Sequence, residues 1–560
     1  MSARRRHDDA PVRIIPLGGL GEIGKNMTAV EHRGKIVVID CGVEFPRDDM
    51  PGIDLVLPDT RWLLERKDDV LGFVITHGHE DHFGALPFVL RDLPRPVYGS
   101  RLTLGLIKPK LDEHGLLARA DLREVSASSR LDLGPFDVSF VAVSHSVPDA
   151  LAVVLRTAAG TVVATGDYKF DHTPIDGRVT DVNAFAQLGE EGVLVLLADS
   201  TNADTPGSTP SESLVGQAFH RIFAEARGRV IVASFASHIH RIQQAIQIAH
   251  LHGRRFAVAG RSMQKNINIA RTLGYLHVPE GAMIKLAEVD DHPADKVLIL
   301  ATGSQGEPLS ALTRMAFDDH PQVELRPDDT VVISASPIPG NETSVMTTVN
   351  RLLKAGVTVV HGEESGVHVS GHAAQEDMRM MLNLLRPRFL VPVHGEYRHQ
   401  YLHAGLARQA GLEAERIFIL ENGQVLEVSR EGAAVVDRVP TGMVFVDGYE
   451  LGDADGLVLR DRRRLAEDGV LIAVATIDAQ TGEPVAAPEV VARGFLHDDA
   501  TLGEVLEECA AELEDLLQEL GREHVTGQRL IEEDIHDRLA RVVYRRTRRR
   551  PMVLPIVVEV

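Results

Sequence analysis

The chain carries the sequence His77-Gly78-His79-Glu80-Asp81-His82 one residue after the apolar run Leu71–Ile75. The run has the length and composition of a β-strand, so these ligand-type side chains leave the end of a strand within one tight loop. Imidazoles and a carboxylate at this density are typical of two divalent ions held close together, above all Zn²⁺. The stretch predicts a metal-dependent hydrolase, with chance clustering of the chain's 25 histidines as the alternative.

Length and composition indicate a globular protein. The chain has 560 residues, 44% hydrophobic and 25% charged, which suits roughly three or four domains. Its two cysteines, Cys41 and Cys509, match no zinc-ligand spacing, which argues against a disulfide scaffold and predicts a reducing, cytoplasmic compartment. Residues 1–10 are charged and show no signal peptide, and the longest apolar runs, such as Val193–Ala198, are only strand-sized. No membrane partner is expected.

The net charge of −22 argues against a globally basic nucleic-acid-binding protein. A local cationic channel is still compatible with it, because bound metal ions add positive charge that a residue count omits. The one dense basic stretch is Arg541–Arg550. A solvated face, a subunit contact and direct RNA contact remain open for it.

The first part of the chain predicts strands joined by short loops, each an apolar, β-branched run bounded by Gly, Pro or Asp. These strands are Val12–Leu17, Lys35–Asp40, Leu71–Thr76, Phe136–Val143, Thr161–Thr165 and Val193–Ala198. Polar residues follow several of them directly, namely His77, Ser144-His145, Gly166-Asp167 and Asp199-Ser200. Because side chains at strand ends gather on one rim of an α/β layer, these residues are candidates for a single site.

Between residues 211 and 364 strands alternate with helices, which indicates βαβ units and a mostly parallel sheet. The expected strand–helix pairs are Val230–Ser234 with His238–His250, Arg255–Ala259 with Ser262–Thr272, Val297–Thr302 with Leu309–Ala316, and Thr330–Ser334 with Glu342–Leu353. A helix over Ala374–Leu385 and a strand over Arg388–Val393 then lead to His394. We therefore expect a parallel-sheet domain inserted between two portions of the first domain.

The C-terminal part predicts a small α+β domain. Residues 452–456 have the composition of a loop, and the charged run Arg460–Arg464 follows it. Strands over Val470–Ile477 and Val553–Val558 flank a helix over Leu502–Leu520, whose apolar residues recur at three- and four-residue spacing. Packing or oligomerisation is the expected role of this part.

Gly19–Gly24 matches the dinucleotide-binding pattern G-x-G-x-x-G and follows a predicted strand. The pattern also requires a helix after the glycines, but the chain steps from Lys25–Val30 into the strand Lys35–Asp40 without room for one. The glycines therefore predict a tight turn bordering the metal site in place of an NAD site.

A pair of ions needs more ligands than one loop supplies, and the other strand ends offer His145, Asp167 and His394. This set resembles the metallo-β-lactamase superfamily, with its HxHxDH loop, single downstream His, strand-ending Asp and late His. The resemblance implies that His77, His79 and His145 hold one zinc, that Asp81, His82 and His394 hold the other, and that Asp167 bridges them. Glu80 is expected to structure the loop without binding metal.

Further motifs resemble the β-CASP nucleases, and most closely the bacterial ribonuclease J family. They are Gly18–Asn26, Ala198–Asn202, Ala233–Arg241, Thr302–Pro308, Ile333–Gly340 and His368–Ala373. The resemblance implies an α/β fold, in which a metallo-β-lactamase αββα sandwich carries an inserted parallel-sheet β-CASP domain and a small α+β C-terminal domain. It places the sandwich at 1–210 and 366–450, the β-CASP domain at 211–365, a linker at 451–466 and the C-terminal oligomerisation domain at 467–560.

The same resemblance implies roles around the metals. Asp199 and His372 correspond to an acidic and a histidine motif, and both, with Asp81, are expected to be catalytic, because a cationic His poised by a carboxylate can protonate a leaving alkoxide. The cluster His368, Val369, Ser370, Gly371 and His372 is expected to bind a 5′ monophosphate, and Phe235 and Ser237 to contact the terminal nucleotide. His238, His240 and Arg241 are either substrate contacts or surface cations at a helix start, and His252 and His403 are expected on the surface.

The expected activity is two-metal hydrolysis of single-stranded RNA, both 5′→3′ exonucleolytic with preference for 5′-monophosphate ends and endonucleolytic, in RNA maturation and decay. Two Zn²⁺ per subunit are expected, and an added Mn²⁺ or Mg²⁺ stays open, with Asp48, Asp49 and Asp447 as an accessory cation site or as solvated loop acids. The expected partners are a second copy of the chain, bound through the C-terminal domain as a homodimer or higher oligomer, and other RNA-decay proteins. The alternatives are a lactonase or thioester hydrolase and a DNA nuclease of the same superfamily.

Overall fold

The computed structural model describes residues 10–47, 49–338, 340–448, 450–452, 457–496 and 498–560. They form two compact units, one comprising the residues up to Phe45 and Val56–Met443, the other Pro46–Leu55 and Val444–Val560. Among these residues, none of the helices combines the length and hydrophobicity required to span a bilayer.

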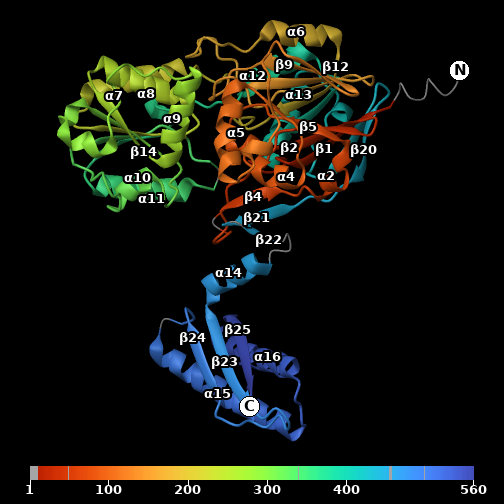
Figure 1. The fold of residues 1–560 in the computed structure, drawn as a ribbon, viewed down its shortest axis with the longest axis vertical. Helices are drawn as coiled ribbons and strands as arrows, with labels where there is room; N and C mark the ends of the chain where they lie inside the picture. The colour runs from red at the N-terminus through yellow and green to blue at the C-terminus, as the bar shows by residue number, and fades with distance from the viewer. Residues whose placement is uncertain (1–9, 48, 339, 449, 453–456, 497) are drawn as a thin grey trace, which may run out of the picture. The chain divides into compact units, whose positions relative to one another are not determined.

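Two sheets packed face to face build the first part of the larger unit (Figure 1). The first contains, in spatial order, β20 (Ala433–Arg438), β19 (Gln424–Val428), β1 (Val12–Gly18), β2 (Met27–His32), β3 (Lys35–Ile39), β5 (Val70–Val74), β6 (Val97–Gly99) and β7 (Leu122–Glu124). The second contains β18 (Phe389–Val393), β12 (Val193–Asp199), β11 (Thr161–Ala164), β10 (Leu151–Arg156), β9 (Phe136–Ala142) and β8 (Arg130–Leu133). Val30 and Val153 belong to the one apolar core that both sheets share.

Helices cover the outer faces of both sheets. Against the second sheet pack α6 (Val182–Glu191), α12 (Gln375–Leu385) and α13 (Tyr397–Gln409), through side chains such as Phe185, Met381 and Leu406. The first sheet carries α4 (Leu86–Asp92) and α5 (Arg101–Glu113), and the short helices α2 (Arg61–Glu65) and α3 (Glu80–Phe83) and the strand β4 (Leu55–Pro58) complete this part. The predicted αββα sandwich is confirmed.

Most of the segment between β12 and β18 is an insertion into the sandwich, while α12 at its end packs on the second sheet. These two strands are parallel neighbours, with Val195 opposite Phe389 and Asp199 opposite Val393, although almost two hundred residues separate them in sequence. The inserted sheet is parallel throughout, in the order β14 (Arg255–Ala259), β15 (Val297–Ala301), β13 (Val230–Ala233), β16 (Thr330–Ile333) and β17 (Thr358–Val360). Its helices are α7 (Ser213–Glu225), α8 (Ile239–Leu251), α9 (Arg261–Leu273), α10 (Ala311–Ala316) and α11 (Glu342–Lys354). The predicted fold class is thereby confirmed.

The smaller unit contains β21 (Met443–Asp447), β22 (Glu450–Gly452) and α14 (Leu457–Asp468), followed by a three-stranded sheet of β24 (Glu489–Arg493), β23 (Val470–Ile477) and β25 (Met552–Glu559). Two helices, α15 (Asp499–Arg522) and α16 (Gln528–Thr547), pack on one face of that sheet. Most of the predicted linker 451–466 is therefore helical, while residues 453–456 of its predicted loop lie outside the described residues.

Several charged side chains whose role the sequence left open form ion pairs in the smaller unit. Arg545 and Arg546 form ion pairs with Glu508 of α15, at 2.9 and 2.7 Å, and remain 63% and 48% exposed, which is compatible with the solvated face considered for the basic stretch. Asp49 pairs with Arg463, and Asp447 pairs with Arg462, while Asp48 lies outside the described residues. The two described carboxylates of the suggested accessory cation site, Asp49 and Asp447, thus have cationic partners of their own.

Most predicted element boundaries agree with the structure within one or two residues, and the helix predicted from Leu309 begins at Ala311. The expected surface position of one histidine, however, is wrong. His403, expected on the surface, is buried on α13, where its Nδ1 lies 2.9 Å from Oγ of Ser200. Local sequence gave no sign of this burial, because the hydrogen-bonding partner, Ser200, lies about two hundred residues away in the chain.

The buried His403 should make the protein acid-sensitive. Burial lowers the pKa of His403 to about 4, against about 6.5 when unfolded, so the unfolded chain binds more protons between these values. Its contribution to stability is therefore complete above pH 6.5 and is lost as the pH falls, by about 2 kcal/mol at pH 5. Replacing His403 by Gln should make the decrease in Tm between pH 7.5 and pH 5 smaller, measured in the presence of a metal chelator. The exposed His361→Gln variant is the control, and equal falls in all three proteins would contradict the assignment.

Candidate metal centre

Strand ends bring the predicted ligands to one rim of the sandwich. His77, His79, Asp81 and His82 follow β5, with His79 at the start of α3, and His145 follows β9. Asp167 follows β11, and His394 follows β18 with φ of +54°. Every residue proposed from sequence as a metal ligand is therefore found in one cluster.

A first group consists of His77, His79, His145 and Asp167, whose ligand atoms all lie within 4.8 Å of one another. Nδ1 of His79 lies 3.0 Å from Nε2 of His77 and 3.1 Å from Nε2 of His145. Burial lowers the pKa of His79 to about 4 and holds the pKa values of His77 and His145 well below their usual range. Three neutral imidazoles thus converge on one point, in the protonation state that a divalent ion requires.

A second group consists of Asp81, His82, Asp167 and His394. Nε2 of His394 lies 3.2 Å from Oδ2 of Asp81, and Nε2 of His82 lies 3.2 Å from Oδ2 of Asp167. Burial opposes the charge of His394, but the carboxylates of Asp167, Asp81 and Asp199 outweigh it and raise the pKa of His394 to about 9. This half of the centre is the more carboxylate-rich.

A third group joins Asp199 and His372 to Asp167 and His394. Nδ1 of His372 lies 2.8 Å from Oδ2 of Asp199, whose side chain is fully buried. Although burial opposes it, the negative charges of Asp199 and Asp167 raise the pKa of His372. His372 is thereby placed beside both ligand groups as a potential proton donor.

The side chains fit a pair of divalent cations. Oδ1 of Asp167 is buried and accepts no hydrogen bond from any described residue, while its Oδ2 lies 3.4 Å from His77 and 3.2 Å from His82. A buried carboxylate oxygen without a partner is costly unless a cation or water satisfies it. Because Asp167 reaches both groups, its position suits a ligand shared by two ions.

Several residues that sequence reasoning missed orient the ligands. Oδ2 of Asp40 lies 2.8 Å from Nδ1 of His82, and Nδ2 of Asn26 donates to the backbone carbonyl of Asp81 at 3.1 Å, which holds the metal loop. Oγ1 of Thr201 lies 2.5 Å from Nδ1 of His394. Partners such as Asp40 and Thr201 fix the tautomer and direction of a ligating imidazole. Asp40 ends an apolar strand, which is the same signal that identified Asp167.

The Gly19–Gly24 segment is a turn beside the centre, as predicted. Gly19, Gly21 and Gly24 have φ of +88°, +74° and +109°, and strand β2 follows without an intervening helix. Leu20 forms a β-bridge with Gly395, the neighbour of His394. Glu80 lies outside the three ligand groups and pairs with Lys110 at 2.9 Å, which agrees with a structuring role.

The residues expected to bind substrate lie in two places. In the segment 368–372, Oγ of Ser370 accepts a hydrogen bond from Asn202, and the carbonyl of Gly371 lies 2.8 Å from Nδ1 of His145. Phe235 and Ser237 are half-buried in the loop between β13 and α8 and take no part in the hydrogen bonds of the metal centre described above. Residues 368–372 thus contact the metal centre directly through Gly371, whereas the hydrogen bonds described above do not link Phe235 or Ser237 to it.

The surface position considered for His238, His240 and Arg241 is wrong. All three are buried, and Arg241 is fully so. Charged and imidazole groups escaped recognition as interior residues because their partners come from distant segments, such as Glu212 and Ser334.

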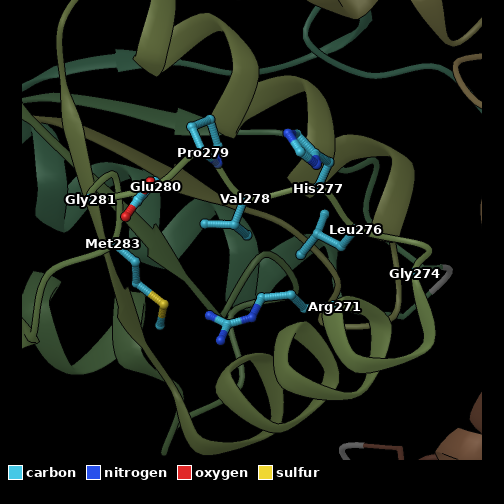
Figure 2. Close-up of a pocket in the computed structure, with 9 residues that line it drawn as sticks. All are labelled: Arg271, Gly274, Leu276, His277, Val278, Pro279, Glu280, Gly281 and Met283. Atoms are coloured by element: carbon cyan, nitrogen blue, oxygen red, sulfur yellow. The ribbon is translucent and has the colours of Figure 1, made fainter.

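Two cavities lie near or within the insert. One of about 780 Å³ includes His145 and is bordered by Arg178 and Asp176 of the sandwich and by His240 and Tyr275 of the insert. Figure 2 shows another, of about 600 Å³, at the end of α9. It is lined by Arg271, Gly274, Leu276, His277, Val278, Pro279, Glu280, Gly281 and Met283, none of which belongs to the ligand groups.

Family models match most of the chain. The metallo-β-lactamase superfamily matches residues 20–207, the ribonuclease J β-CASP domain 227–352, the Zn-dependent metallo-hydrolase RNA specificity domain 364–419, and the ribonuclease J C-terminal domain 457–560. Ribonuclease J of Thermus thermophilus is 46% identical, over 98% of this chain and 95% of that protein. The chain belongs to the ribonuclease J family.

Other similarities extend over the same length. Ribonuclease J 1 of Streptococcus pyogenes is 43% identical, over 98% of this chain and 97% of that protein, and Ribonuclease J2 of Bacillus subtilis is 42% identical, over 98% and 99%. A crystal structure of a protein of unknown function from Enterococcus faecalis matches with a TM-score of 0.52 and 16% identity, over 75% of this chain and all of that one. That last likeness shows the fold alone.

Gly42 lies against the loop that carries Asp81 and His82, and this contact allows a test of the metal centre. A Cβ at position 42 would lie 1.6 Å from the carbonyl oxygen of Asp81. The backbone of Asn26 lies between the two segments, because its N–H donates to Asp81 and its carbonyl accepts from the N–H of Gly42. Gly42→Ala should displace Asp81 and His82 and lower both metal content and activity, the latter by about a hundredfold. Elemental analysis of purified protein measures the first effect.

Gly503→Ala is the matched control, because among the described residues no atom outside the adjoining helix backbone lies within 4 Å of the Cβ it adds in α15. It should retain the metal content of the wild type. Full metal occupancy in Gly42→Ala would contradict the arrangement described.

Proposed function

We propose that this chain is a zinc-dependent ribonuclease that hydrolyses single-stranded RNA, from 5′-monophosphorylated ends in the 5′→3′ direction and also internally. The observation that carries the proposal is the convergence of seven ligand-type side chains with the Asp199–His372 pair at one rim. Membership of the ribonuclease J family supports RNA as the substrate class.

We assign His77, His79 and His145 to one ion, Asp81, His82 and His394 to the other, and Asp167 to both. Zn²⁺ is the ion proposed, since the donors are imidazole nitrogens and carboxylate oxygens. Elemental analysis of the purified protein would also detect an added Mn²⁺ or Mg²⁺. Two such ions supply Lewis acidity to a phosphodiester and lower the pKa of water. The protein's part is to fix the donors, through Asp40, Asn26 and Thr201.

His372 is proposed as the general acid. The carboxylate of Asp199, 2.8 Å from Nδ1, favours the cationic ring and leaves Nε2 to donate a proton to the departing ribose oxygen. Asp199 is itself oriented by the backbone N–H and the hydroxyl of Thr201, at 3.0 and 2.8 Å. Protonation of the leaving group by a positioned acid lowers the barrier to P–O cleavage.

RNA binding is proposed at the segment 368–372 and at Phe235 and Ser237. Ser370 and the backbone of Gly371 and His372 border the metal centre, where a phosphate would lie. Half-buried Phe235 offers a ring for stacking a terminal base, a sequence-tolerant mode of binding single strands. The domain boundaries predicted from sequence and a cytoplasmic location form part of the same proposal.

The decisive assay compares matched single-stranded RNA and DNA with a thioester. The wild type should release mononucleotides from 5′-monophosphorylated RNA and act weakly on the other two. Cleavage of DNA at the same rate, or turnover of the thioester alone, would favour the alternative hydrolases. RNA with a 5′ triphosphate measures the end preference, and a circular RNA measures internal cleavage.

His79→Ala tests the ligand assignment in the same assay. It removes one of three converging imidazoles, so RNA cleavage should fall by about a hundredfold or more and metal content should drop below about two ions per chain. Mononucleotide release at the wild-type rate would show that the assignment is wrong.

We further propose that copies of the chain associate through the C-terminal sheet. On the face opposite α15 and α16, Leu554, Ile556 and Val558 are 40–43% exposed, and Ile472 and Val474 lie beside the first two in the neighbouring strand. Contiguous exposed apolar residues of this kind mark interaction surfaces.

Ile556→Asp should lower the mass measured by light scattering, because it places a charge in the apolar contact. Leu353→Asp, at an exposed position of α11, is the control and should leave the mass unchanged. A wild type that is monomeric at micromolar concentration would overturn this part of the proposal.

A further inference from the structure

We infer that Arg241, paired with Glu212, is a positioning residue that holds the segment 367–372 in the geometry needed to bind RNA. The inference rests on the proposed function, and it adds a role for a residue of the insert that touches neither metal ligands nor the proposed RNA contacts at Phe235 and Ser237. Arg241 lies in the first turn of α8 and is fully buried.

The pair with Glu212 is bidentate. Nε of Arg241 lies 2.6 Å from Oε1 of Glu212, and Nη2 lies 3.0 Å from Oε2. Glu212 lies between β12 and α7, where the chain first passes from the sandwich into the insert, and its backbone N–H donates to Asp171 of the sandwich. The guanidinium is thus fixed in direction as well as in place, because its planar fork matches the carboxylate.

Other hydrogen bonds of Arg241 reach the segment where the chain returns from the insert to the sandwich, while Nη2 also lies 3.2 Å from Nε2 of His238. Nη1 donates to the carbonyl of Val367 at 3.2 Å and Nη2 to the carbonyl of Val369 at 3.3 Å. Nη1 also lies 3.3 Å from Nδ1 of His368. One side chain therefore holds the backbone on both sides of His368 and the ring of His368 itself.

Ser334 completes the attachment from the end of β16. Nη1 of Arg241 donates to its carbonyl and hydroxyl oxygens at 2.9 and 2.8 Å, and its hydroxyl donates to the carbonyl of Val367. The insert thus holds residues 367–369 through Arg241 and through Ser334, which share the carbonyl of Val367 as a partner.

The held segment leads directly into the metal centre. Two residues after Val369, the carbonyl of Gly371 lies against His145, and a Cβ at Gly371 would lie 2.6 Å from Cε1 of that ring. His372 follows, in contact with Asp199. A shift of the backbone at 367–369 would therefore move the proposed phosphate-binding groups and the proposed acid relative to the metal ligands, which come from strands that Arg241 does not contact.

Arg241→Lys is the informative variant, because lysine keeps the charge opposite Glu212 but loses the fork that reaches Val367 and Val369. We expect KM for 5′-monophosphorylated RNA to rise by about tenfold or more. Hydrolysis of bis(p-nitrophenyl) phosphate, which needs the metals but not an RNA-binding segment, should fall much less. Hydrogen exchange at residues 366–372 should be faster than in the wild type.

Arg229→Lys is the matched control. Arg229 is equally buried in the insert, at the opposite end of β13, and forms a bidentate pair with Asp329 at 2.9 and 2.6 Å. It should lower the Tm comparably while leaving KM for RNA and exchange at 366–372 unchanged. Ser334→Ala serves as a second, milder variant if Arg241→Lys does not fold.

Unchanged KM and unchanged exchange in folded Arg241→Lys would overturn the inference. So would equal losses on RNA and on the small diester, which would mark Arg241 as a general support of the metal centre. A wild type inactive on RNA would instead overturn the proposed function, while hydrogen exchange would still report whether Arg241 holds the segment.

Discussion

The carboxylate of Asp167 belongs to all three groups of ligand-type side chains, and it is nearly inaccessible to water. A buried negative charge is costly unless positive charge surrounds it. Here the imidazoles of His394, His82 and His372, whose own pKa values are raised, hold the pKa of Asp167 well below its usual range despite burial. Imidazoles at the ends of β5, β9 and β18 surround this carboxylate: Nε2 of His77, His145 and His394 lies 3.4, 3.6 and 3.7 Å from one of its oxygens.

The sandwich meets this requirement through strand order. β11, β12 and β18 are neighbours, so Asp167, Asp199 and His394 emerge side by side at their carboxyl ends. The loop after β5 comes from the facing sheet and supplies His77, His79, Asp81 and His82, while His145 follows β9 of the same sheet as Asp167. The metal centre therefore lies where the ends of two sheets meet, and the insertion adds a second domain beside it without interrupting the hydrogen bonding of either sheet.

The abrupt change from apolar to polar residues at strand ends made His145, Asp167 and His394 candidate ligands. The resemblance to the metallo-β-lactamase superfamily and the β-CASP nucleases supplied the fold class and completed the set of seven proposed ligands. Sequence reasoning failed where the deciding partner is remote. Arg241 and His403 look like ordinary surface residues of helices, and only Glu212, Val367 and Ser200, brought close by tertiary folding, explain their burial. Asp40 was treated as the end of a strand, yet it orients His82. The helix α16 was overlooked because its many charged side chains mask its buried face of Ile531, Ile535, Leu539 and Val542.

The adjacency of β12 and β18 also bears on how such an enzyme diversifies. A module whose entry and exit are neighbouring strands can be lengthened, trimmed or exchanged while the host sheet keeps its register. Natural variation in that module would change which polymers reach the metal centre and leave the metal ligands unchanged. The same junction is a rational place to graft a foreign recognition domain, provided that the graft recreates a buried cation facing Glu212.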